Sequence, residues 1–299
     1  MLPIRKYIWV VETIRRAGRI TLKELNDKWR DNDDLSMGKD LPRQTFDRWK
    51  GCILDLFGII IDCERGGLYR YYIANPKVLD SGDVQAWLYN TYSALCSLSG
   101  NMAVYDRILA ENVPSSQTFL KTVLGAMKAN AVLQITHRSF GEGQAKTHRV
   151  EPYSLKLSSQ RWYLLARCVE INSLRLYSLD RLESTQITDE KFEMPEGFDA
   201  KKYFSEFFGI VIDGEVPLQR VVIRADKDHK YYMRTLPLHS SQREIYACDE
   251  YADFELTLRP TYDFYMKLMS FGDMVKVIAP QELQQEICRR LKNTLDVYK

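Results

Sequence analysis

Alternation of side-chain types in four short segments is the feature that most limits how this 299-residue chain can fold. The segments lie between residues 131 and 190 and read AVLQITHRSF, THRVEPYSLKL, QRWYLLARCV and SLRLYSLDRL. Neighbouring side chains of a strand point to opposite faces of its sheet. Short alternating segments separated by turn residues predict a small barrel or a strongly curved sheet.

The adjacent aromatic residues Trp162 and Tyr163 therefore cannot face the same core. Trp162 shares its face with Leu164 and Ala166, whereas Tyr163 shares its face with Arg167. We predict that Trp162 packs inside the sheet and that Tyr163 lines a surface.

Arginine and aromatic side chains recur on the polar faces of these segments. Arg175, Tyr177 and Arg181 share a face of the last segment, and Arg149 and Tyr153 share a face of the second. Arginines beside aromatic rings suit a phosphate and a stacked base. An exposed polar face with unrelated arginines is the alternative, because register cannot be read from one sequence. The candidate ligand-binding residues are His137, His148, Arg149, Tyr153, Tyr163, Arg175 and Arg181.

Residues 1–75 have the pattern of three helices followed by a hairpin. Gly18 ends the first apolar stripe, and Thr21 precedes Glu24 by three residues, which is a helix-start signal. DNDDLSMGKD has the composition of a polar loop, and GIIIDC and LYRYYI flank the turn sequence ERGG. This order predicts a winged helix-turn-helix domain.

The predicted third helix begins near Pro42, and its buried stripe is expected to be Phe46, Trp49, Ile53 and Leu56. A recognition helix places hydrogen-bond donors near its N-terminus, where they reach base edges in the major groove. A solvated charged face is the alternative, and Asp47 adds a negative charge to it. The candidate DNA-binding residues are Arg43, Gln44, Thr45, Arg48, Lys50 and Arg65.

Three further blocks complete the predicted α+β multidomain chain. Residues 76–130 are helical and would form a connector or a dimer surface. Residues 131–215 hold the β-rich block, and residues 216–299 have a βαββαβα-like order ending in an amphipathic helix.

Composition and motifs narrow the class of function. The net charge is only +2, so nucleic-acid binding would depend on local patches. The sequence has no run of 18 or more apolar residues, so we predict no membrane helix. The N-terminal residues have the pattern of a structural helix rather than that of a signal peptide. The four histidines lack metal-ligand spacing, and the six separated cysteines predict reduced thiols. We expect neither a metal nor a cofactor.

The stretches RWYLLARCV and LRLYSLDRL resemble the bacterial WYL-domain transcriptional regulators. The tripeptide is Trp162, Tyr163 and Leu164, HRVEPYSL is similar to the family's upstream element, and Asp180 and Arg181 match its D-R-[IL] pattern. PLHSSQ and SFGDMVKVIAP resemble the family's C-terminal WCX extension, so the resemblance covers nearly the whole chain.

The resemblance implies an Sm-like or SH3-like WYL barrel that senses an anionic or nucleic-acid-derived ligand and controls an attached DNA-binding domain. It also implies a bacterial cytoplasmic protein that binds operator DNA, expected as a homodimer. Carried over, the pocket residues are Tyr163, Arg175 and Arg181, with Tyr153. Two positions depart from the pattern: His137 replaces a frequent tyrosine, and His148 replaces an arginine.

Three hypotheses remain open at this point. The first is a ligand-responsive, sequence-specific transcriptional regulator. The second is a nucleic-acid-binding or partner-docking protein without effector control. The third is a phosphodiesterase that uses His137 and His148, but no catalytic motif supports it, and we expect that the protein is not an enzyme.

Overall fold

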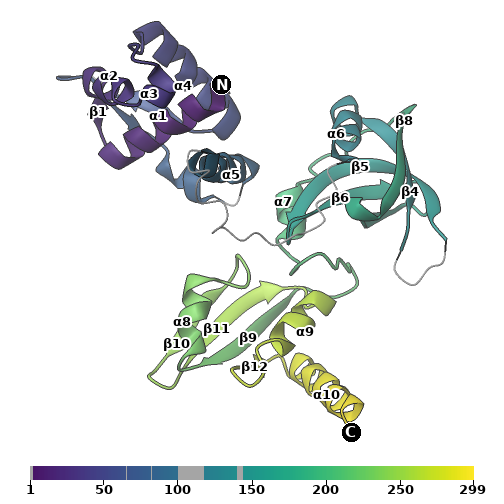
Figure 1. Ribbon diagram of the computed structural model, residues 1–299. Helices are drawn as coiled ribbons and strands as arrows, with labels where there is room; N and C mark the ends of the chain where they lie inside the picture. The colour runs from purple at the N-terminus through teal and green to yellow at the C-terminus, as the bar shows by residue number, and fades with distance from the viewer. Residues whose placement is uncertain (1–2, 65, 82, 100–117, 140–143) are drawn as a thin grey trace. The chain divides into compact units, whose positions relative to one another are not determined.

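The computed structural model describes residues 3–64, 66–81, 83–99, 118–139 and 144–299. Internal contacts divide the chain into two compact units, residues 1–111 and residues 112–299 (Figure 1). The expected mixture of helices and antiparallel sheets is present. The domain boundaries at residues 75, 130 and 215 stay predictions.

The N-terminal unit combines helices with an antiparallel sheet of order β1-β3-β2. The predicted hairpin is confirmed, because β2 and β3 pair with Ile61 opposite Ile73. The predicted helix start is also confirmed, because Thr21 and Glu24 form a capping box. The elements are α1 (Pro3–Ala17), β1 (Ile20–Thr21), α2 (Leu22–Arg30), α3 (Asp33–Ser36), α4 (Arg43–Phe57), β2 (Ile61–Cys63), β3 (Arg70–Ile73), the 3₁₀ helix η1 (Pro76–Asp80) and α5 (Val84–Ser99).

The buried stripe of α4 differs from the predicted one at its last position. Phe46, Trp49 and Ile53 are buried as expected, but Leu56 is 43% exposed and Phe57 is buried in its place. The spacing of four from Ile53 to Phe57 keeps this large ring on the side that packs against the rest of the unit. The prediction for Leu56 was therefore wrong.

The expected polar loop between α2 and α4 contains a short helix. Residues Asp33–Ser36 form α3, in which Leu35 is buried. Composition could not predict this helix, because one leucine among acidic residues gives no periodic pattern.

The helix α5 packs against α1 and α4, so it belongs to the N-terminal unit. The Tyr89 hydroxyl donates a hydrogen bond to the Glu12 carboxylate, and the Tyr89 ring meets Phe57 edge-on at 5.6 Å between centroids. Burial, followed by the hydrogen bond to Glu12, raises the pKa of Tyr89 above its usual range. The helix α6 (Leu120–Ala129) packs instead on a sheet of the second unit, so α5 and α6, both within the predicted connector, join different units (Figure 1).

The second unit contains a five-stranded antiparallel sheet of order β7-β6-β5-β4-β8. The edge strands β7 and β8 form no ladder with each other in the described part of the sheet, so the predicted closed barrel is not observed. The segment SLRLYSLDRL is also not one strand, because η3 interrupts it. The elements are β4 (Ala131–His137), β5 (Lys146–Ser158), β6 (Arg161–Cys168), β7 (Ser173–Ser178), the 3₁₀ helix η3 (Leu179–Arg181) and β8 (Leu182–Lys191).

One face of this sheet packs against α6. Val123 and Ala126 of the helix are fully buried against Leu133 and Leu164. Trp162 is partly buried against the same cluster, which confirms its predicted place in the core. The apolar alternation of β4 and β6 thus builds this core.

The remainder of the unit follows the predicted βαββαβα order, with a sheet of order β10-β11-β9-β12. The connection from the five-stranded sheet passes Gly209, where φ is +76° and a Cβ atom would lie 2.3 Å from the Asp263 carboxylate. That carboxylate accepts hydrogen bonds from the N–H groups of Ile210 and Val211. The elements are α7 (Ala200–Phe204), β9 (Gln219–Asp226), α8 (His229–Thr235), β10 (Arg243–Ala247), β11 (Tyr251–Leu258), α9 (Tyr262–Met269), β12 (Val275–Ala279) and α10 (Gln281–Val297).

The contact between Tyr89 and Glu12 gives a stability prediction for the N-terminal unit. Tyr89→Phe should lower the free energy of unfolding of this unit by about 2 kcal/mol, because it removes a part-buried hydrogen bond to a charged group. Urea titration with tryptophan fluorescence measures this, since every tryptophan except Trp162 lies in the unit. Tyr92→Phe, on the same helix, is the control and should change the value by less than about 0.5 kcal/mol. Equal losses in both variants would contradict the prediction.

Candidate functional site

The side of α4 opposite its buried stripe presents the candidate DNA-binding residues. Arg43, Gln44 and Arg48 are exposed, whereas Thr45 and Lys50 are half-buried. Pro42 precedes the helix in an extended conformation, so Arg43 and Gln44 lie in its first turn. Donors in this turn have the placement that base-edge contacts in a major groove require.

Asp47 pairs with two of the cations on this helix. The Lys50 amine lies 2.8 Å from its carboxylate, and the Arg43 guanidinium lies 3.9 Å from it. Lys50 also lies 5.2 Å above the centre of the Tyr71 ring. Lys50 is thus held against the body of the unit, while Arg43, with a side chain that is 77% exposed, keeps only a loose surface pair.

The hairpin of β2 and β3 flanks α4 across a groove of about 700 Å³. Arg65, the predicted phosphate contact of the hairpin, lies outside the described residues. The groove is lined by Thr21, Leu22, Lys23, Arg43, Asp47, Lys50, Asp62, Cys63, Leu68, Tyr69 and Tyr71.

Strand register divides the candidate ligand residues of the second unit into two groups. Tyr163 lies opposite Ser178, whereas Arg175 lies opposite Ala166. Tyr163 and Ala166 are three residues apart in one strand, so Tyr163 and Arg175 point to opposite faces of the sheet. A single pocket that combines both side chains on one face is not what the structure shows.

Arg149 and Tyr153 lie on the face away from α6 and are already engaged. The Arg149 guanidinium pairs with Glu190 at 2.8 Å and with Glu170 at 3.5 Å. Tyr153 is buried, and its ring stacks on Phe192 at 5.9 Å between centroids. Burial and then the neighbouring Glu151 raise the pKa of Tyr153. Both side chains therefore stabilise the sheet.

Tyr163 lies on the same face and is also buried, so the prediction that it lines a surface was wrong. Burial raises the pKa of its hydroxyl, and the nearby cations Arg161 and Arg181 act in the opposite direction. Arg161 pairs with Asp180 at 3.4 Å. Arg181 belongs to η3 and lines a small cavity of about 250 Å³ together with Asp180 and Glu183.

His137 and His148 lie on the face that meets α6, beside Tyr177. The ring of Tyr177 is 5.5 Å from His137 and 6.1 Å from His148, between centroids. Burial, followed by a hydrogen bond with Cys168, raises the pKa of Tyr177 well above its usual range. Arg175 is exposed and acts on the Tyr177 pKa as a nearby positive charge.

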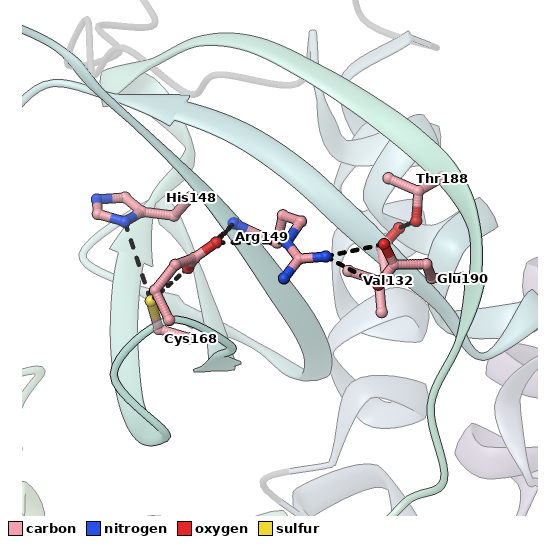
Figure 2. Close-up of polar contacts among 7 residues, drawn as sticks. Val132, His148, Arg149, Cys168, Thr188 and Glu190 are labelled. Atoms are coloured by element: carbon pink, nitrogen blue, oxygen red, sulfur yellow. Dashed lines mark hydrogen bonds and ion pairs between the residues drawn. The ribbon is translucent and has the colours of Figure 1, made fainter.

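Three side chains that the sequence analysis did not select complete this group: Tyr177, Cys168 and Glu170. The sulfur atom of Cys168 lies 3.9 Å from Nδ1 of His148 (Figure 2). The same sulfur atom lies 3.2 Å from Oε2 of Glu170. Burial alone would raise the pKa of Glu170, but its own N–H and that of Arg149 bind the carboxylate and lower the pKa. The signal that could have found this group is the pairing of β5 with β6, which spacing along the chain does not contain.

Comparison with known families identifies both parts of the second unit. Residues 118–187 match the WYL domain, and residues 217–295 match the WCX domain. The second unit therefore contains a WYL domain and a WCX domain. The WYL match comprises α6 and the five-stranded sheet into β8, and the tripeptide Trp162, Tyr163 and Leu164 lies in β6.

The chain is similar to Protein PafC of Mycobacterium tuberculosis, with 23% identity over 192 residues. The match covers 64% of this chain and 58% of PafC, so the chain spans over half the length of the curated relatives it matches. Proteasome accessory factor B/C of Arthrobacter aurescens has 20% identity and a TM-score of 0.38, with 98% of this chain and 46% of that chain covered. A CRISPR Cas-related protein has 12% identity and a TM-score of 0.41, with 91% and 76% covered.

None of the helices in the described ranges is both long and apolar enough to cross a bilayer.

Arg167, which pairs with a buried carboxylate, should contribute more to the stability of the WYL domain than the exposed Arg175. Arg167 binds the buried carboxylate of Glu151 through Nε at 2.6 Å. Arg167→Ala would leave that charge with the hydrogen bond from Tyr153 but without its positively charged partner. The loss should be about 2 kcal/mol, between the values for surface and buried pairs, because Arg167 is itself partly exposed. Urea titration by far-ultraviolet circular dichroism measures it. Arg175→Ala is the control, with an expected change below about 0.5 kcal/mol. A larger loss of stability from Arg175→Ala than from Arg167→Ala would contradict the prediction that Arg167 is the structural arginine.

Proposed function

We propose that this protein is a DNA-binding transcriptional regulator whose WYL domain responds to an anionic effector derived from nucleic acid. The N-terminal unit is proposed to act as a winged helix, with α4 as its recognition helix. The protein would act in the bacterial cytoplasm as a homodimer on two half-sites, without catalysing a reaction.

The exposed N-terminal turn of α4 is the observation that carries the proposal. Arg43, Gln44 and Arg48 leave the helix on one exposed side, and the β2–β3 hairpin lies beside it. A helix with side chains is roughly 10–12 Å across and fits a major groove about 12 Å wide. Arg43 can donate two hydrogen bonds to a guanine edge, and Gln44 can pair with an adenine.

Asp47 limits how strongly this helix can hold DNA without regard to sequence. Its carboxylate neutralises part of the charge of Arg43 and Lys50, the two cations nearest to it. Affinity for any duplex grows with the number of phosphates that cations neutralise. Because Asp47 reduces the free energy that phosphate contacts can supply, tight binding by this helix requires additional free energy from contacts with bases.

Pairing within the WYL domain narrows the proposed effector residues. Arg149 and Arg167 already hold carboxylates, and Tyr153 is part of the core. Arg175 is exposed on the face that carries His137 and His148, and we assign it the anionic group of the effector. Arg181 lies near Tyr163, on the opposite face of the sheet from Arg175, and we propose it as a second cation for an anionic effector.

Titration of duplex DNA tests the recognition helix. Arg43→Ala should weaken binding to the duplex upstream of the protein's own gene by about 1–3 kcal/mol, with little effect on random duplex, because a base contact is lost. Arg48→Ala should weaken both and reduce the salt slope by about 1, because a phosphate contact is lost. Fluorescence anisotropy at several salt concentrations measures these changes.

Arg16→Ala is the matched control for charge. Arg16 is 83% exposed in the same unit, but it lines a separate groove with Asp31, Asp33 and Asp34, where DNA phosphates would be repelled. Its removal should leave both affinities unchanged. The proposal fails if no duplex is preferred, or if Arg43→Ala and Arg16→Ala behave alike.

Addition of nucleotides or short single strands tests the effector. An effector that binds one state better than the other must change the affinity for the upstream duplex. Arg175→Ala should remove this response and keep duplex binding, whereas Lys128→Ala, an exposed cation on α6, should keep both. Salt-dependent binding of single strands with no effect on duplex affinity would instead support a nucleic-acid-binding protein without effector control.

A further inference from the structure

Three potential metal ligands of the WYL domain meet at one end of the five-stranded sheet. Nδ1 or Nε2 of His148, Sγ of Cys168 and a carboxylate oxygen of Glu170 all lie within 4.8 Å of one another. They form a mixed nitrogen, sulfur and oxygen set, which differs from the all-oxygen sets that Mg²⁺ and Ca²⁺ prefer. The proposed DNA and effector contacts use none of the three side chains.

The register of β5 and β6 builds this set from residues that are far apart in the chain. Cys168 lies opposite Val150, so His148, two residues earlier in β5, points to the same face. The N–H of Val169 donates to the carbonyl of Arg149 and extends the pairing past the end of β6. Glu170 follows in the turn, and its carboxylate reaches back to the sulfur of Cys168.

The separations of the Cys168 sulfur from the other two donor atoms are close to those of a tetrahedral zinc site. With Zn–S near 2.3 Å and Zn–N or Zn–O near 2.0–2.1 Å, a sulfur ligand lies roughly 3.6 Å from each other ligand. Here the Cys168 sulfur lies 3.9 Å from Nδ1 of His148 and 3.2 Å from Oε2 of Glu170. The His148 nitrogen and the Glu170 oxygen lie within 4.8 Å of each other, whereas two such ligands of a tetrahedral ion lie roughly 3.3 Å apart. An ion would therefore draw these two groups together, and Glu170, in an exposed turn, can move toward it.

The carboxylate of Glu170 has the outer support that metal-binding carboxylates usually have. The N–H of Arg149 donates to Oε1 at 3.1 Å, and the Arg149 guanidinium lies 3.5 Å from the same oxygen. Glu190 holds the other end of that guanidinium at 2.8 Å (Figure 2). The same Arg149 N–H also donates to Oε2 at 3.3 Å. These contacts orient the Glu170 carboxylate, whose Oε2 also accepts from Cys168.

We propose that His148, Cys168 and Glu170 bind one Zn²⁺ ion, with a water molecule or another small ligand in the fourth position. On binding, the Cys168 thiol loses its proton to solvent and the thiolate coordinates the ion, while Nδ1 of His148 supplies a lone pair. The burial gradient suits this role, because Cys168 is buried, His148 is half-buried and Glu170 is exposed toward the entry side. The inference goes beyond the proposed regulator function and does not depend on it.

Cobalt titration of the full-length protein, after treatment with a chelator, tests the site. Co²⁺ bound to a thiolate gives a charge-transfer absorption in the near ultraviolet, and Zn²⁺ should displace it. We expect one Co²⁺ per chain, and one Zn²⁺ per chain by mass spectrometry of the metal after gel filtration. Absence of the absorption from the native protein would overturn the proposal.

Variants assign the ligands. Cys168→Ser should remove the absorption, and Glu170→Gln and His148→Gln should each weaken Co²⁺ binding at least about 10-fold, the lower end of the loss reported even for outer contacts. Glu170→Gln changes an exposed side chain and should fold normally, so it keeps the test valid if Cys168→Ser unfolds. Cys288→Ser, which removes an exposed thiol of α10, is the matched control and should bind as the native protein does. Native-like binding by Glu170→Gln and His148→Gln would overturn the proposal.

Discussion

The antiparallel pairing of β5 with β6 and of β6 with β7 decides what the WYL domain can do. Cys168 opposite Val150 and Tyr177 opposite Leu164 set the register of three strands. A shift of one residue in either ladder would exchange every side chain between the two faces. In the observed register, the apolar positions of β6 meet α6, and the same face carries His148, Cys168 and Arg175 to one end. The core and the candidate sites therefore depend on the same constraint.

Charge pairing then separates the arginines that stabilise the fold from those that remain for ligands. Arg167 holds the buried Glu151, and Arg224 of the WCX domain holds Asp253 at 2.7 Å with its guanidinium 3.6 Å from the centre of the Tyr251 ring. Loss of such an arginine leaves a desolvated carboxylate, so its cost is mainly structural. Exposure and partners, rather than residue type, thus support the proposed roles of Arg175 with an anion and of Arg43 with DNA.

Sequence patterns predicted most elements but only part of the site. Alternation placed Trp162 and Tyr163 on opposite faces, and the capping signal at Thr21 was confirmed, because both features depend on neighbouring residues alone. The break at η3 and the added strand β8 were missed, since SLDRL continues the apolar alternation of β7 without a turn signal. The group around Cys168 was missed for another reason: its members meet only through strand pairing, which one sequence does not contain.

The proposed zinc site and Arg175, the proposed contact for an anion, lie on one face of the sheet, so their occupancies should be linked. With Zn²⁺ bound, the two positive charges of the ion balance the thiolate of Cys168 and the carboxylate of Glu170, so the net charge is zero. Without the ion, the thiol and the carboxylate together carry one negative charge. Binding therefore makes the face more positive by one charge, once the proton of Cys168 has left. Arg175 lies in the strand that follows the turn of Glu170, and an anion beside it would be attracted by this change. Linkage is reciprocal, so an anionic effector that tightens with Zn²⁺ must also tighten the binding of Zn²⁺.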